Sequence, residues 1–122
     1  MMQERPFLGT GPGTFAYAFT QHQPPGNQRH YTMAHNDYLH AFSETGLILA
    51  SILAWMIWAL FRKGLHKMKH PSRLVRGTTL GSLAGILAIL VHSLGDFNLH
   101  IPANAIIFSA LTAMACSPLP VA

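Results

Sequence analysis

Charged residues are scarce in this sequence. They make up 10% of the 122 residues, whereas half of the residues are hydrophobic. A typical soluble domain carries about 25% charged residues. Acidic residues are the scarcest, because the chain has only Glu4, Asp37, Glu44 and Asp96. So little polar surface cannot cover a soluble globule of this size, and the composition therefore favours a membrane protein.

The sequence contains a single cysteine, which limits the covalent cross-links and metal sites that the chain can form. The single Cys116 excludes a disulfide within the chain and a Cys-pair zinc site. The eight histidines do not form a His-Glu-x-x-His motif, and His35 and His40 point about 140° apart on a helix. We therefore expect no bound metal, and a piece of a histidine-rich metal transporter is the least favoured alternative.

Basic residues are concentrated in one short segment. Six of the eight Lys and Arg residues lie within residues 62–76, between two apolar runs, and all four acids lie outside it. This distribution is typical of a cytoplasmic loop in a membrane protein. It favours the membrane over nucleic acid as the partner, and we expect no nucleic-acid binding.

Three apolar stretches, residues 46–61, 77–94 and 101–116, predict about three transmembrane helices. A span takes roughly 20 residues, which the first two stretches reach with their flanks, whereas the third is short. The predicted fold is therefore an all-α, polytopic membrane protein, with residues 1–45 as an outer loop region and 46–122 as the membrane part. Residues 1–45 contain no signal segment, so we expect further transmembrane helices before them in a longer chain.

Small residues recur at every fourth position in the first two apolar stretches. Gly77, Gly81 and Gly85 form one such stripe, and Gly46, Ala50 and Ala54 form another. Such spacing lets membrane helices approach closely, and the two stripes together favour a larger helix bundle. A small, non-enzymatic membrane subunit that packs through these stripes is therefore one alternative for the function.

A polar segment rich in chemically active side chains precedes the first apolar stretch. It begins with His35, Asn36 and Asp37. Histidine can accept a proton near neutral pH, and a positioned general base contributes roughly 10²–10⁴-fold to a reaction rate. From the residues alone, the simpler interpretation is an interfacial histidine at the start of a helix.

The same segment resembles the O-antigen ligase and polymerase superfamily. His35-Asn36, nine further residues and Gly46 are similar to a motif in the large periplasmic loop of that family. Residues 5–15 resemble the Gly-rich entry to this loop, and residues 92–103 resemble a later periplasmic turn. Ligases usually continue the motif with further glycines, whereas Leu47-Ile48-Leu49 follow here. The choice between a ligase and a polymerase therefore remains open.

The resemblance implies a reaction and a place in the cell. A glycan carried on undecaprenyl diphosphate would be transferred to an acceptor at the periplasmic face of the bacterial inner membrane. The acceptor is the lipid A core in ligases, and another glycan or a protein hydroxyl in polymerases and protein O-oligosaccharyltransferases. The family needs no metal or nucleotide cofactor. His35 would be the catalytic base or an essential acceptor-site residue.

Further residues are implied to bind substrate. Arg5 and Arg29 are the arginines on the expected outer side, and guanidinium groups match the oxygens of a diphosphate. Solvated loop charges explain these arginines equally well. Asn36 belongs to the motif, and Asp96 could orient His35 or bind sugar hydroxyls. Carboxylates also favour the first turn of a helix, so capping remains an alternative for Asp37 and Glu44.

Overall fold

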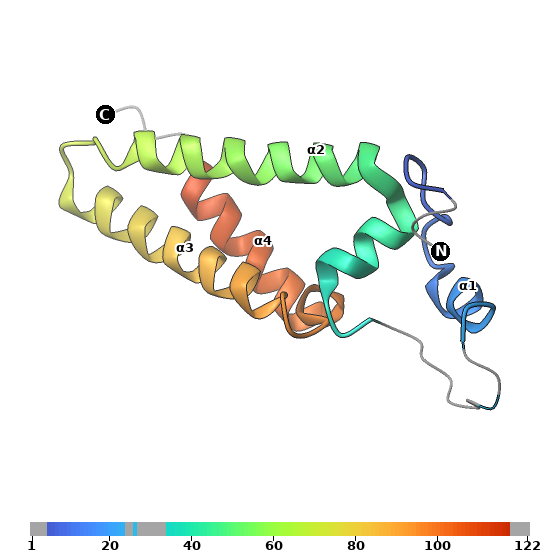
Figure 1. The fold of residues 1–122 in the computed structure, drawn as a ribbon. Helices are drawn as coiled ribbons and strands as arrows, with labels where there is room; N and C mark the ends of the chain where they lie inside the picture. Colours follow the sequence, from blue (N-terminus) through green and yellow to red (C-terminus); the bar gives the residue numbers. More distant parts are fainter. Residues whose placement is uncertain (1–4, 24–25, 27–33, 118–122) are drawn as a thin grey trace. The chain divides into compact units, whose positions relative to one another are not determined.

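The computed structural model describes residues 5–23, 26 and 34–117, which are shown in Figure 1. The described residues form helices joined by turns and contain no strand, which confirms the all-α class. The elements follow the order α1 (Phe15–Thr20), α2 (Asp37–Lys67), α3 (Arg73–His92), the 3-10 helix η1 (Asn98–His100) and α4 (Pro102–Cys116). The chain forms two compact units: unit 1 combines residues 1–54 with 93–97, and unit 2 combines 55–92 with 98–122.

Two of these helices, α2 and α3, are long and apolar enough to cross a membrane. A kink at Gly46 interrupts α2, because this residue has φ 68° and ψ −172°. At about 1.5 Å per residue the part of α2 after the kink is about 30 Å long, which matches a hydrocarbon core of ~30 Å. The third apolar stretch forms α4, an apolar helix of 15 residues that is shorter than a usual span.

The basic segment is more helical than the sequence suggested. Of the predicted loop 62–76, only residues 68–72 lie between α2 and α3. Lys and Arg are good helix formers, so they extend both helices beyond the apolar stretches that we used to place the spans. At the other end, α3 stops at His92 and leaves the following residues to a turn.

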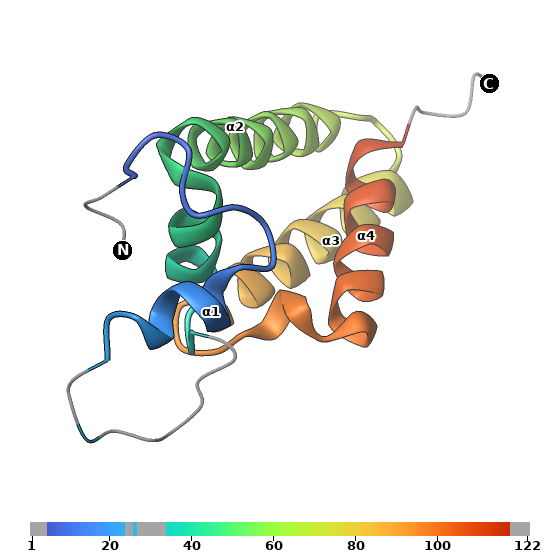
Figure 2. The same ribbon diagram turned by 90° about the vertical axis from the view of Figure 1, so that its right-hand side faces the viewer.

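The core of unit 2 lies between α3 and α4, which run alongside each other in Figures 1 and 2. Leu83, Ile86 and Leu90 of α3 and Ala115 of α4 are buried there. Residues of the second half of α2 pack against this cluster, namely Ile57, Leu60 and Phe61. The helix spacing of the three α3 residues places them on one face, which explains why a single stripe of α3 makes the core.

The predicted small-residue stripes have unequal roles. A Cβ added at Gly85 would lie 2.9 Å from Leu111 Cδ1 of α4, so this glycine lies at a helix contact. Gly77 and Gly81 have no described atom within 4 Å of such a Cβ. The stripe that begins at Gly46 is interrupted, because the kink at this residue ends the regular helical spacing toward residues 50 and 54.

A close helix contact also occurs at Gly64, which the stripes did not include. A Cβ at this position would lie 2.7 Å from Leu83 Cδ2 of α3. Close approach in unit 2 therefore depends on one glycine in α2 and one in α3, rather than on a continuous repeat.

We expect Gly85→Leu to destabilise unit 2 more than Gly81→Leu does. Both changes replace a helical glycine, so both gain about the same helix propensity. Only the leucine at 85 must displace Leu111, and overpacking of this kind costs roughly 1–3 kcal/mol. Thermal unfolding of both variants in detergent measures the difference, and equal midpoints would contradict the assigned α3–α4 contact.

Candidate functional site

Three segments that are distant in the sequence come together in unit 1. They are the Gly-rich residues 5–15, the start of α2 with the His-Asn pair, and the turn at residues 93–97. Figure 2 shows the Gly-rich segment crossing the kinked region of α2. The three motifs that the sequence analysis singled out therefore form one structural neighbourhood.

His35 lies immediately before α2 and is exposed to solvent. Its ring contacts the ring of Phe97, with the centroids 5.5 Å apart and the planes at 54°. This aromatic contact restricts one side of the imidazole, while its exposure leaves the ring accessible to a substrate.

Asn36 fixes the backbone next to His35. Its Oδ1 accepts a hydrogen bond from the Leu39 amide at 3.0 Å, which makes Asn36 the N-cap of α2. Its Nδ2 donates to the Leu94 carbonyl at 2.7 Å. The Asp37 amide also donates to the Ser93 carbonyl at 3.0 Å. Asn36 thus ties the start of α2 to the turn that follows α3.

Asp96 lies in this turn and is partly exposed. Its Oδ1 accepts a hydrogen bond from the Phe97 amide at 2.8 Å. In the part of the chain that the structure describes, no hydrogen bond or ion pair joins Asp96 to His35. The structure brings the neighbouring Phe97 against the histidine, and the Asp96 carboxylate shapes the turn that carries this ring.

Of the two arginines expected to hold a diphosphate, only Arg5 lies among the described residues. Arg5 is exposed at the beginning of the Gly-rich segment, and its carbonyl accepts a hydrogen bond from the Gly9 amide at 2.9 Å. Arg29 lies outside the described residues. The structure therefore places one of the two arginines beside the loop entry.

The Gly-rich segment is bound to α2 through the backbone groups that the kink leaves without helical partners. In a continuous helix the Ser43 and Glu44 carbonyls would accept from residues 47 and 48. Four backbone hydrogen bonds replace these two: Thr10 N to Ser43 O at 3.0 Å, Gly11 N to Glu44 O at 2.8 Å, Leu47 N to Pro6 O at 2.8 Å and Ile48 N to Phe7 O at 3.3 Å. Since unpaired backbone groups are costly when buried, the kink and the loop stabilise each other.

Two glycines make this crossing possible. Gly46 and Gly9 have φ of 68° and 67°, a region that residues with side chains rarely adopt. A Cβ on Gly46 would lie 2.4 Å from the Phe7 carbonyl carbon, and one on Gly9 would lie 2.3 Å from the Glu44 carbonyl oxygen. The glycine that ends the His-Asn motif is therefore required by backbone contact, and the sequence alone did not give this reason.

The side chain of Glu44 binds the first turn of α1. Its Oε2 accepts from the Gly13 amide and its Oε1 from the Phe15 amide, both at 2.9 Å. Thr14, the residue before α1, makes no side-chain capping bond of its own. A carboxylate is favourable at a helix N-terminus, where amide groups lack partners. Glu44 thus caps α1 and not the start of its own helix.

His40 extends this contact into a small cluster. Its Nε2 lies 3.4 Å from Glu44 Oε1, and its ring stacks on Phe15 with centroids 4.7 Å apart. The relative exposures of His40 and Glu44 are only 6% and 8%. The pair therefore has a structural position behind the loop, whereas His35 is the exposed histidine of the motif.

Comparison with known families gives a match to the part of the chain that contains most of this site. Residues 1–54 match the O-antigen ligase family model. This match covers less than half of the chain and contains the Gly-rich entry, the His-Asn pair and the kink. It confirms the predicted resemblance to the O-antigen ligase family over this part of the chain. No match was found among curated proteins or among solved structures.

Sequence reasoning toward this family missed several residues that build the site. The i,i+4 spacing of His40 and Glu44 could have shown that they share a helix face, but no local pattern indicates their contact with α1. Phe97 and Ser93 were passed over inside the late turn. Ser93 is fully buried, and its Oγ has no hydrogen-bond partner among the described residues.

We expect Gly46→Ala to release the Gly-rich segment, whereas Gly13→Ala leaves it bound. Both glycines have positive φ, so both substitutions strain the backbone. At Gly13, however, no described atom lies within 4 Å of the new Cβ. Amide hydrogen exchange at Gly11 and Leu47 should accelerate in Gly46→Ala alone. Equal protection in both variants would show that the crossing tolerates a side chain.

Removing the charge of Glu44 should loosen α1 selectively. In Glu44→Gln one oxygen remains as an acceptor, so we expect partial loss of amide protection at Gly13 and Phe15, by roughly 1–2 kcal/mol. In Glu44→Ala both bonds are lost and protection should fall further. Exchange rates at the α3 amides serve as the internal control, and unchanged rates at Gly13 and Phe15 would refute the cap.

Proposed function

We propose that this chain is part of a glycosyltransferase of the O-antigen ligase type. The observation that carries the proposal is the family match, which includes His35. The contacts within unit 1 add support, because the three motifs meet and leave His35 exposed. The proposed donor is a glycan on undecaprenyl diphosphate, and the proposed acceptor is a sugar hydroxyl of the lipid A core or a similar glycan.

In the proposed reaction His35 is the general base. The acceptor hydroxyl gives its proton to the imidazole while its oxygen attacks the anomeric carbon of the donor sugar. The bond from that carbon to undecaprenyl diphosphate breaks, and the diphosphate leaves with the electron pair. The Asn36 cap and the Phe97 ring support this role, because they hold the backbone and one side of the imidazole in place.

Arg5 and Arg29 are proposed to neutralise the diphosphate, since guanidinium remains charged and binds phosphate oxygens in pairs. Two arginines are few for a diphosphate. We therefore propose that further membrane helices complete the cavity that binds the lipid-linked donor. Asp96 is proposed to bind a sugar hydroxyl. Its Oδ2 supports this role, because it makes no hydrogen bond among the described residues. The two polar atoms of Asn36 already bind backbone groups, so its contribution to binding is to position the motif.

The family and the two apolar helices indicate a membrane protein. We place it in the bacterial inner membrane as a multi-pass protein, with the motifs on the periplasmic face and the basic segment in the cytoplasm. The hydrogen bonds between the start of α2 and the turn after α3 support a shared side for the two motifs. The concentration of Lys and Arg between these helices supports the cytoplasmic assignment of the other side.

We expect His35→Ala to lower glycan transfer at least 100-fold, the lower limit for loss of a positioned base. The assay uses membranes that contain the full-length protein, a lipid-linked glycan donor and its acceptor. His22→Ala is the matched control, because His22 is another exposed histidine of the N-terminal region. It should retain activity. Undiminished transfer by His35→Ala, with normal membrane insertion, would favour the non-enzymatic alternative.

A further inference from the structure

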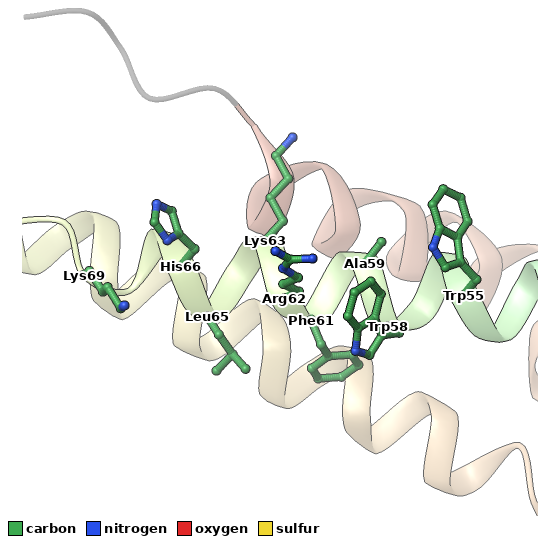
Figure 3. A pocket seen from close by; sticks show the side chains of 9 residues that line it. All are labelled: Trp55, Trp58, Ala59, Phe61, Arg62, Lys63, Leu65, His66 and Lys69. Carbon is green, nitrogen blue, oxygen red and sulfur yellow. The ribbon is translucent and has the colours of Figure 1, made fainter.

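A hollow runs along the final turns of α2 in unit 2. Figure 3 shows that its side chains come from successive turns of this helix and from Lys69, just beyond the end of the helix. Cationic and aromatic groups line most of it. The complete lining is Trp55, Trp58, Ala59, Phe61, Arg62, Lys63, Leu65, His66 and Lys69.

The charge of this hollow is of one sign. Arg62, Lys63 and Lys69 contribute three permanent cations, and the sequence contains no acidic residue between Glu44 and Asp96. No carboxylate within residues 45–95, which include the hollow and all of α3, can therefore neutralise these cations. The hollow is complementary to an anion.

The basic residues that surround the hollow differ from those inside it. Lys67 donates to the Met114 carbonyl and to Ser117 Oγ, both at 2.9 Å, so it caps the end of α4. Arg76 donates to the carbonyls of residues 70 and 71 at 3.3 Å. Arg62 and Lys63 make no hydrogen bond or ion pair with the residues that the structure describes. Their polar groups remain available in the hollow.

Aromatic and apolar groups occupy the part of the hollow nearer the middle of α2. Trp55 and Trp58 are 63% and 55% exposed. The guanidinium of Arg62 lies 5.2 Å from the ring centroid of Trp58, within the range of a cation–π contact. Tryptophan favours the membrane–water interface, and Lys and Arg near a helix end extend toward the headgroups. Along α2, the order is thus apolar rings first and cations second.

We propose that this hollow binds an anionic phospholipid, with the headgroup phosphate at Arg62 and Lys63 and the acyl chains along Trp55 and Trp58. The sequence of apolar rings and then cations matches the order of acyl chain and phosphate in such a lipid. The site lies at the end of α2 remote from His35 in the sequence, so it is separate from the proposed glycan chemistry. It would anchor the basic end of the helix to one leaflet.

The chain offers a direct reporter for this site. Its two tryptophans, Trp55 and Trp58, both line the hollow, so intrinsic tryptophan fluorescence arises there alone. The chain is placed in vesicles of phosphatidylcholine, with a small fraction of either dibrominated phosphatidylglycerol or dibrominated phosphatidylcholine as quencher. We expect stronger quenching by the anionic lipid.

Two matched double variants test the assignment. Arg62→Gln with Lys63→Gln should reduce the preference for phosphatidylglycerol roughly thirtyfold, since each cation near an anionic leaflet strengthens the attraction about fivefold. Arg73→Gln with Arg76→Gln removes the same charge outside the hollow and should retain most of the preference. The exchanged pair Arg62→Lys with Lys63→Arg keeps both charges and should retain the preference as well. Helix content by circular dichroism is the control for folding.

Several outcomes would overturn the proposal. Equal loss in the two Gln variants would show diffuse attraction by the whole basic segment. Absence of preference in the unaltered chain would exclude the anionic headgroup, and absence of quenching by either lipid would show that protein covers the hollow. Reversal of the preference by inorganic phosphate, but not by chloride at equal ionic strength, would identify a free phosphate site.

Discussion

The organisation of unit 1 depends on the crossing of two backbones at Gly46. The kink at this residue interrupts the hydrogen-bond ladder of α2, and the Gly-rich segment supplies the missing donors and acceptors. Close contact requires glycine on both sides, at Gly9 and Gly46. Once the segment is fixed there, α1 begins next to the Glu44 carboxylate, and Phe15 packs on His40. A short helix of six residues, which is not stable alone, is thereby held in one place.

His35 lies beyond this framework and depends on it indirectly. The first part of α2 is held by the loop at its kinked end and by the turn at residues 93–97 at its beginning. As a result, His35 presents an exposed side chain from a backbone that is fixed at both ends of this helical part. Burial separates the two histidines of the motif, because His40 is enclosed with Glu44 while His35 remains open to solvent. This division supports the proposal that His35 is the base and His40 a structural residue.

Much of this arrangement could be predicted from the sequence, and the limits have physical causes. Hydrophobicity located α2 and α3, the two helices long and apolar enough to cross a membrane, and the shorter apolar α4. The helix ends were less accurate, because Lys and Arg extend helices without adding hydrophobicity. The spacing to Gly46 was recognised, but its cause was not, because a backbone crossing with residues 6–11 leaves no local pattern. For the same reason the contact of Phe97 with His35 was not foreseen.

The hydrogen bonds of the crossing join peptide groups and involve few side chains. Phe7 and Leu8 of the Gly-rich segment are 61% and 75% exposed, although the Phe7 backbone lies against the kink. Mutation at these two positions can therefore change the surface presented beside Gly46 without altering the path of the chain. A library that randomises Phe7 and Leu8 while keeping Gly9 and Gly46 would therefore vary this surface on an unchanged backbone.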